Sequence, residues 1–430
     1  MSPSKVIAES KRDPSEQRRK LFARNVETVR REWYKFAVFV SALCLIIFLK
    51  YSAADLLYAF HWIDDPKISD FLTYYFTGGG TWLSGSNPYA NQAQFAYPPT
   101  FLPFFGLFSF LGDINLAAKL WVVSYFSVFT IASVALSFTL SSERRYVYLA
   151  VALLLLLISF PLKYLIELSQ IDLFVASLTV LSLVCQRIDR KIASAFLLSV
   201  ATLFKGPAIF LLIYFAIFRR DLKYLLYFAA STIAIVGISL IVVPIKLYSD
   251  YFVNVLPTLF SQYELPDSQS VVRLLYLAGL SKPALQIVSV AGIGLFAIFA
   301  FKVGSSKSLV LFGESSILDD GVFLMNGLIV LLFSPRSLIY PYVWVILPLA
   351  LFLSGILVEA NPKLLYLGVI CLGAFLVNSE PYSPNAPFSL STLTLIPWIT
   401  IGNLLLTLSL MPMYVRPLAF FRSKHFMRHK

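Results

Sequence analysis

The sequence is poor in charged residues: Asp, Glu, Lys and Arg make up only 13% of its 430 residues. Soluble domains carry about 25% charged residues, so this composition excludes a soluble fold of this size. Hydrophobic residues reach 58%, and the mean hydropathy is +0.77. Because backbone groups inside lipid must pair within the chain, such a sequence forms membrane-spanning helices or a closed barrel.

The long apolar runs lack the period-two alternation that barrel strands require. Val147 to Phe160 and Tyr224 to Val243 contain no charged residue and no regular polar–apolar alternation. Barrel strands alternate and are only about 9 to 11 residues long. We therefore expect an all-α polytopic membrane protein.

Cysteine and histidine are scarce, with three of each. Cys44, Cys185 and Cys371 all lie in apolar runs, where a cysteine packs as a small hydrophobic residue. Two of the histidines, His425 and His429, lie in the basic C-terminal tail. This pattern excludes a disulfide framework and indicates neither a zinc nor a haem site. We expect no metal and no other cofactor.

Positive charge is abundant, with a net charge of +12, and 26 of the 35 Lys and Arg lie in clusters. The clusters fall at 5–35, 144–145, 187–191, 219–223, 302–307, 363 and 416–430. Since Lys and Arg collect in cytoplasmic loops, we place every cluster and both termini in the cytoplasm and expect no nucleic-acid partner. Neighbouring clusters must then be separated by an even number of spans, which about twelve apolar runs satisfy. These runs are 36–58, 114–140, 146–166, 170–186, 192–204, 207–218, 224–244, 284–301, 321–334, 338–357, 364–378 and 391–411.

This topology predicts a basic N-terminal segment at 1–35, a transmembrane domain at 36–412 and a basic tail at 413–430. The first outer loop covers 59–113, and the second large outer loop covers 245–283. Because the large loops lie on the side opposite the termini, we expect the functional site at the outer face of the cell membrane.

Two segments depart from simple spans. The runs 192–204 and 207–218 are too short to cross about 30 Å alone, so we expect a hairpin that turns at Lys205-Gly206-Pro207. The apolar stretch 97–111 would break the charge rule as a span, so we expect a helix at the outer interface. Cations outside the clusters are functional candidates, because charge placed against the topology rule is costly. They are Lys50, Lys67, Lys119, Lys163, Lys205, Lys246, Arg273, Lys282 and Arg336.

The first outer loop carries the most informative residues. Residues 70–83 fit a short helix on which Asp70, Tyr74 and Thr77 share one face. A turn at Gly85 to Pro88 follows, and Pro98-Pro99 starts the next helix. A carboxylate backed by aromatic rings suits a general base that acts on a sugar hydroxyl; the alternative is that Asp70 only caps its helix.

The order of these elements resembles the first outer loop of the glycosyltransferase 87 family. The resemblance is carried by Asp70 at a helix start, Trp82, Gly85-Ser86-Asn87-Pro88-Tyr89 and Phe95-Ala96-Tyr97-Pro98-Pro99. Weaker matches are Ser169-Gln170-Ile171-Asp172, Lys205-Gly206-Pro207, and Phe333-Ser334-Pro335-Arg336 with Tyr340 and Tyr342. Ser169 and Asp172 stand where the family usually has Gly and Asn, and no histidines follow Pro335 where many relatives carry them.

The resemblance implies a catalytic domain of the GT-C superfamily within 36–412. Such enzymes transfer a hexose, mostly mannose, from a polyprenyl-phosphate sugar to a lipid-linked or glycan acceptor with inversion. It implies Asp70 as the catalytic base, with Asp64 or Asp65 as alternatives, and cations for the donor phosphate. The phosphate candidates are Lys205, Arg273 and Arg336. The candidate substrate contacts are Tyr74, Asn87, Tyr89, Tyr97, Gln170, Asp172, Tyr340 and Tyr342.

Structural alternatives stand beside these roles. Lys205 could pair with Glu167 or Asp172, Arg273 with Asp267, and Gln170 and Asp172 could simply pair with Lys163. The alternative function is a multi-spanning transporter or lipid flippase, because twelve spans with both ends inside is a common transporter count. Transporters place binding groups near the midplane between repeated halves. Here we find no repeat, and the candidate polar groups gather at one surface.

Overall fold

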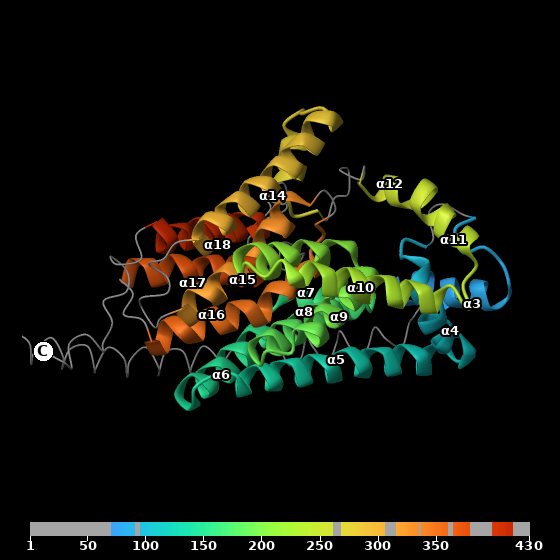
Figure 1. Cartoon of the computed structure of the whole chain (residues 1–430), viewed down its shortest axis with the longest axis horizontal. Helices are drawn as coiled ribbons and strands as arrows, with labels where there is room; N and C mark the ends of the chain where they lie inside the picture. Colours follow the sequence, from blue (N-terminus) through green and yellow to red (C-terminus); the bar gives the residue numbers. More distant parts are fainter. Residues whose placement is uncertain are drawn as a thin grey trace, which may run out of the picture. The chain divides into compact units, whose positions relative to one another are not determined.

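A computed structural model describes residues 70–90, 95–260, 268–305, 315–334, 337–359, 364–378 and 398–415. Every regular element within these residues is a helix (Figure 1), which confirms the all-α fold class. The expected span 36–58 lies outside the described residues. The first loop forms a π-helix η3 (Phe71–Phe76), α3 (Thr77–Leu83), a 3₁₀-helix η4 (Pro99–Phe101) and α4 (Leu102–Phe110).

The helices of the first loop pack closely because α3 carries three consecutive glycines. A Cβ on Gly79 would lie 2.5 Å from the carbonyl carbon of Phe105, so only glycine lets the backbones of α3 and α4 approach this closely. A Cβ on Gly80 would meet Ser109 Cβ at an ordinary 3.6 Å. The helix start predicted at Pro98-Pro99 is confirmed, since Pro99 opens η4.

The next helices run along the bundle. Helix α5 (Ile114–Phe138) begins at Asp113, whose carboxylate accepts hydrogen bonds from the backbone N–H groups of Asn115 and Leu116. Helices α6 (Ser142–Ile158) and α7 (Phe160–Leu168) are bent by 61° at Ser159, where Pro161 removes a backbone donor.

The predicted hairpin forms around Lys205. Helix α8 (Asp172–Arg187) is followed by α9 (Lys191–Phe204), which ends where Lys205 takes an extended backbone. A 3₁₀-helix η5 (Gly206–Leu211) and a π-helix η6 (Ile213–Phe218) return from the turn. Both halves are therefore short helices, as their lengths indicated.

The remaining helices complete the described chain. They are α10 (Lys223–Ser239), α11 (Ile245–Asp250), η7 (Tyr251–Val255), α12 (Leu256–Phe260), α13 (Val271–Leu277), α14 (Lys282–Ser305), α15 (Ser315–Phe333), η9 (Tyr340–Val345), α16 (Ile346–Glu359), α17 (Leu364–Asn378) and α18 (Trp398–Val415).

Three described helical segments are long and apolar enough to cross a membrane: Ile114–Phe138, Lys282–Val303 and Tyr340–Val358. The bent pair α6 and α7 would make a fourth. The other described apolar helices are shorter, so the count of twelve spans is not confirmed and stays a prediction. Tyr340–Val358 is mostly buried within the bundle, whereas Lys282–Val303 is mostly exposed.

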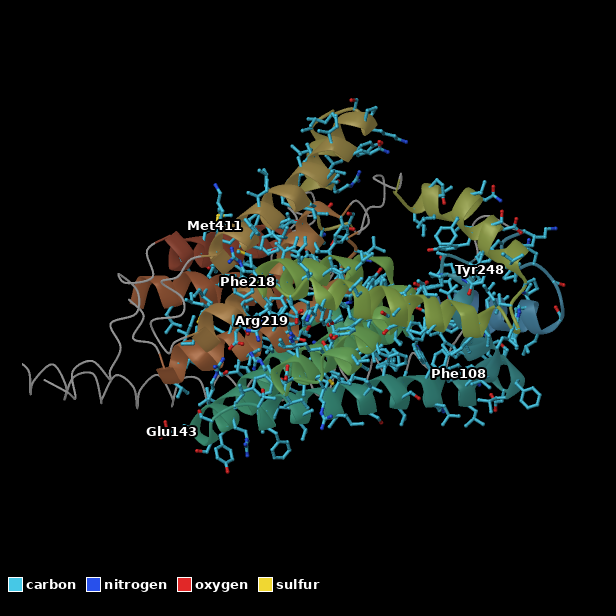
Figure 2. All side chains as sticks on the ribbon, in the orientation of Figure 1. Phe108, Glu143, Phe218, Arg219, Tyr248 and Met411 are labelled. Atoms are coloured by element: carbon cyan, nitrogen blue, oxygen red, sulfur yellow. The ribbon has the colours of Figure 1, made fainter. Side chains whose placement is uncertain are left out.

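Three of the basic clusters meet on two acidic residues of α15. The Asp320 carboxylate, which is fully buried, accepts hydrogen bonds from Arg144 and Arg187. Asp319 pairs with Arg219 at 3.0 Å and accepts a 2.8 Å hydrogen bond from the Tyr214 hydroxyl. In Figure 2, Arg219 and Glu143 lie toward one end of the bundle, and Phe108 and Tyr248 lie toward the other. These three clusters therefore share one end, which their expected placement on one side of the membrane requires.

Candidate active site

The turn between α7 and α8 lies at the centre of the candidate site. Ser169 adopts a left-handed backbone (φ 52°, ψ 43°), and the Gln170 N–H donates to Leu165 O at 3.0 Å, which closes the end of α7. The Trp121 indole N–H donates to Ser169 O at 2.8 Å. The turn thereby fixes the positions of Gln170 and Asp172 at the start of α8, where both side chains are almost fully buried.

Gln170 contacts Asp70 directly. Its side-chain amide donates a hydrogen bond to the half-buried Asp70 carboxylate. Asp70 makes no side-chain hydrogen bond to the first turn of its own helix, so the alternative that it serves as a helix cap is wrong here. The carboxylate is instead held by a residue 100 positions away in the sequence.

The π geometry of η3 changes which tyrosine joins Asp70. An α-helix would turn Tyr75 away from the face of Asp70, but the wider turn of a π-helix, whose hydrogen bonds join residues five apart, brings Tyr75 closer to that face. The Tyr75 hydroxyl donates to Gln170 Oε1 at 3.0 Å, and Tyr74 is only half-buried. Tyr75 was not among the residues predicted for the site, because no feature of the segment predicts a π-helix in place of an α-helix.

Lys205 contacts the same turn through Asp172. Its ammonium forms an ion pair with the fully buried Asp172 and lies 4.7 Å from the centroid of the Tyr340 ring. The Tyr340 ring in turn stacks on Tyr164 at 6.3 Å. Of the partners considered for Lys205, Asp172 is thus the one the structure shows. The side chain keeps 19% of its surface exposed, so a second anion can still reach the ammonium.

Asn87 and Tyr89 tie the first loop to the segment after α10. The Asn87 side-chain amide donates to Asp250 at 2.8 Å, and its oxygen accepts from the Tyr89 N–H at 2.9 Å. The Tyr89 hydroxyl donates to Tyr97 O at 2.7 Å. Burial raises the pKa of Tyr89 well above its usual value, so the phenol stays protonated. Both tyrosines, Tyr89 and Tyr97, are buried and contact protein rather than open surface.

The segment before α13 contacts η9 through Tyr342. The buried Tyr342 hydroxyl donates to Gln269 O, and the Gln269 N–H donates to Ser337 O at 2.6 Å. Arg273, four residues after Gln269, is half-buried, and its guanidinium lies 5.4 Å from the Tyr276 ring centroid. Three candidates, Asp64, Asp65 and Arg336, lie outside the described residues.

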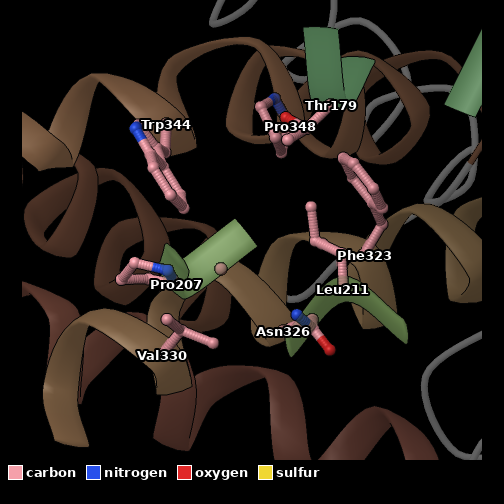
Figure 3. Close-up of a pocket in the computed structure, with 9 residues that line it drawn as sticks. Thr179, Pro207, Leu211, Phe323, Asn326, Val330, Trp344 and Pro348 are labelled. Carbon is pink, nitrogen blue, oxygen red and sulfur yellow. The ribbon is translucent and has the colours of Figure 1, made fainter. Parts of the chain in front are cut away.

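A small cavity lies within the bundle beyond the Lys205 turn (Figure 3). It is lined by Thr179, Pro207, Leu211, Phe323, Asn326, Gly327, Val330, Trp344 and Pro348. Its volume of about 20 Å³ holds roughly one water molecule, whereas small-molecule sites take about 300 to 1,000 Å³. The cavity is therefore not a sugar or isoprenoid site in this conformation.

A carboxylate and a cation both contact residues of one turn. Asp70 contacts Gln170, and Lys205 contacts Asp172, only two residues further along α8. A carboxylate can take a proton from a hydroxyl, and a half-buried ammonium can stabilise an anionic leaving group.

One comparison with known proteins identifies a family. The profile of glycosyltransferase family 87 matches residues 95–335, more than half of the chain. The match covers Tyr97, the Ser169–Asp172 turn, Lys205 and Arg273, while Asp70 and its helix precede it. No curated protein matches the chain.

Proposed function

The chain belongs to glycosyltransferase family 87, and we propose that it is an inverting hexosyltransferase that takes its sugar from a polyprenyl-phosphate donor. The sugar is a hexose, with mannose the first choice, and the acceptor is a lipid-linked sugar or glycan. The enzyme lies in the cell membrane with both termini in the cytoplasm and acts on the outer face.

One observation carries this proposal: Asp70 and Lys205 contact residues 170 and 172 of the same turn. The donor's anomeric carbon would lie between them, with the acceptor hydroxyl near Asp70 and the donor phosphate near Lys205. An in-line displacement at the anomeric carbon would need this placement.

In the proposed mechanism, Asp70 takes the proton of the acceptor hydroxyl as its oxygen attacks the anomeric carbon. The bond between the anomeric carbon and the phosphate oxygen breaks, and the lipid phosphate leaves with the electron pair. This leaving group is already ionised, so it needs a cation rather than a general acid. Lys205 supplies that charge, with Arg273 and Arg336 as further phosphate contacts.

The remaining candidate residues shape the site around these two groups. Tyr74 and Asn87 on the first loop, with Tyr340 beside Lys205, are proposed to contact the sugars. Tyr342 and Tyr97 are both buried, so they are proposed to support the site from within the bundle. The apolar donor tail would lie against the lipid-facing helices.

The test is incubation of the purified protein with a panel of polyprenyl-phosphate sugars and simple glycoside acceptors. Release of lipid phosphate with formation of a new glycoside, lost in Asp70→Asn, is the expected result. Sugar-lipid movement across sealed vesicles without any glycoside formed would instead favour the flippase alternative.

A further inference from the structure

A glutamine side chain can face a carboxylate in two ways, and the choice decides whether the contact attracts or repels. With Nε2 toward Asp70 the amide donates a hydrogen bond; with Oε1 toward Asp70 two acceptors meet. The groups on the far side of the Gln170 amide therefore determine whether Asp70 is held in place.

Two tyrosine hydroxyls lie on that far side. Tyr75 and Tyr97 each have their hydroxyl 3.0 Å from Gln170 Oε1, and the two hydroxyl oxygens are 2.7 Å apart. The Ile171 backbone N–H donates to the Tyr75 oxygen at 3.2 Å. Each phenol has one proton to donate.

These protons fix the direction of the amide. If Tyr75 donates to Tyr97, the proton of Tyr97 is available for Gln170 Oε1; if Tyr97 donates to Tyr75, the proton of Tyr75 is. In either arrangement Oε1 accepts, and Nε2 faces Asp70. Burial first, and the neighbouring Tyr97 second, raise the pKa of Tyr75 well above its usual value, so the phenol keeps its proton at neutral pH.

Both phenols are themselves held rigidly by rings. Tyr75 stacks on Phe105 at 4.8 Å and meets Tyr97 edge-on at 5.0 Å. Tyr97 is also held through its backbone carbonyl, which accepts from the Tyr89 hydroxyl. Tyr75 and Gln170 are almost completely buried, so water does not compete for these hydrogen bonds.

We propose that Tyr75 and Tyr97 are positioning residues which, through the Gln170 amide, hold the Asp70 carboxylate in the direction needed for proton transfer. This inference rests on the proposed function, in which Asp70 is the base. It gives Gln170 a role in orienting the base rather than in contacting the acceptor. Because a misplacement of about 1 Å can cost 100-fold in rate, loss of this orientation acts on turnover.

The test is a double-mutant cycle on purified, folded protein, with kcat and KM measured for the same donor and acceptor. Tyr75→Phe with Tyr97→Phe removes both hydroxyls and should lower kcat about 10- to 100-fold, with KM for the donor changed less than about 3-fold. In a Gln170→Met background, which is already impaired, the same pair should lower kcat by less than about 2-fold, because the amide they act through is gone.

Tyr125→Phe is the matched control. Tyr125 is fully buried, packs on Trp121 at 5.8 Å, and its hydroxyl has no hydrogen-bond partner in the described part of the chain. It should leave kcat unchanged. Gln170→Leu replaces Gln170→Met if the latter fails to fold.

Each outcome decides the proposal. Equal losses from the tyrosine pair in both backgrounds, or a loss in KM alone, would show a merely structural role and overturn it. Unaltered kcat in the tyrosine pair would also overturn it while the proposed function stands. Absence of any sugar transfer by the wild-type protein would remove both at once.

Discussion

The two ends of α8 hold their charges in opposite ways. At its last turn, Arg187 shares the fully buried Asp320 with Arg144, and Arg219 pairs with Asp319 nearby. At its first turn, roughly 22 Å away, Asp172 holds one half-buried lysine, and the neighbouring Gln170 holds one half-buried carboxylate.

The ion pair of Arg144 and Asp320 is buried, whereas the charges held at the first turn of α8 are partly exposed and can contact a ligand. Arg144 also donates to Leu351 O at 2.8 Å and passes so close to Gly355 that a Cβ there would lie 2.8 Å from its Nη2. Arg144 and Asp320 are 2% and 0% exposed, so this pair does not reach a ligand, whereas Arg219 at the same end keeps 38% of its side chain exposed. Asp70 and Lys205 are half-buried, and each keeps an exposed fraction that a ligand can contact.

The largest effect on turnover is expected at Asp70, whose carboxylate is partly exposed. Asp70→Asn keeps the side-chain shape but cannot accept a full proton, so sugar transfer should fall 10²- to 10⁴-fold while donor binding persists. Turnover and donor affinity measured on folded protein check this. Asp113→Asn is the control, because the Asp113 carboxylate only caps α5; its turnover should stay near wild type.

Asp70→Asn turnover above about a tenth of wild type would contradict this assignment. The carboxylates at Asp64 and Asp65 would then be next in line, and Asp64→Asn and Asp65→Asn would identify which one serves.

At the last turn of α8, where Arg187 and Arg144 share Asp320, the expected effect is on stability. Asp320→Asn leaves Arg144 and Arg187 without their counter-charge, so the free energy of unfolding should drop by about 3 to 5 kcal/mol. Turnover of the protein that remains folded should not change. Thermal unfolding in detergent measures the first, and kinetics on the folded fraction the second.

The surface pair Lys191 and Asp221 provides the comparison. Lys191→Met breaks an ion pair at the partly exposed first residue of α9, and we expect little change in melting temperature. An equal loss from Asp320→Asn and Lys191→Met would mean that burial of the network adds nothing.

Lys205 should show both kinds of effect, and a second substitution separates them. Lys205→Ala removes the proposed phosphate contact and leaves Asp172 buried without it, so stability and donor affinity both fall. Adding Asp172→Asn should restore most of the stability but not the affinity, which we expect to stay about 10- to 100-fold weaker. Donor titration followed by thermal shift gives both quantities. Recovery of affinity in the double variant would show that Lys205 only neutralises Asp172.

The smallest effect concerns the turn that joins the two groups. Ser169 has φ 52°, a conformation that costs an L-residue roughly 1 to 2 kcal/mol and glycine almost nothing. Ser169→Gly loses the hydrogen bond from Ser169 Oγ to Ile166 O and has a more flexible unfolded chain. We expect a net gain in stability of at most about 1 kcal/mol, with unchanged turnover. A loss of stability would mean that the hydroxyl outweighs the strain.

The sequence predicts the helices better than the contacts. Apolar runs locate α5, α8, α14 and α17 closely, because the run and the helix are set by the same residues. The pairing of Gln170 with Asp70 joins residues 100 positions apart, and neither local spacing nor charge counting indicates it. The turn at Lys205 is predictable from two runs too short to span, but its partner Asp172 is one of two acids, with Glu167, that the sequence offers.

The positive clusters illustrate the same limit. They were interpreted as loops that fix topology, and three of them do share one end of the bundle. Their ion pairs with Asp319 and Asp320 are not predictable from the sequence, because these two acids lie on α15, far along the chain. Family 87 membership follows from the central region, whereas the number of spans, the acceptor and the sugar stay predictions.

The ion pairs of Arg144 and Arg187 with Asp320 on α15 also constrain the order in which the helices can assemble during synthesis. Arg144 and Asp320 are 176 residues apart, and a ribosome that adds about 5 to 20 residues per second needs roughly 9 to 35 s to make the stretch between them. During that interval Arg144 does not have Asp320 as its partner, and an unpaired guanidinium inside hydrocarbon is costly. The helices that carry these arginines, α6 and α8, must therefore keep the side chains at a polar surface. They can pack fully at this end only after α15 has been synthesised.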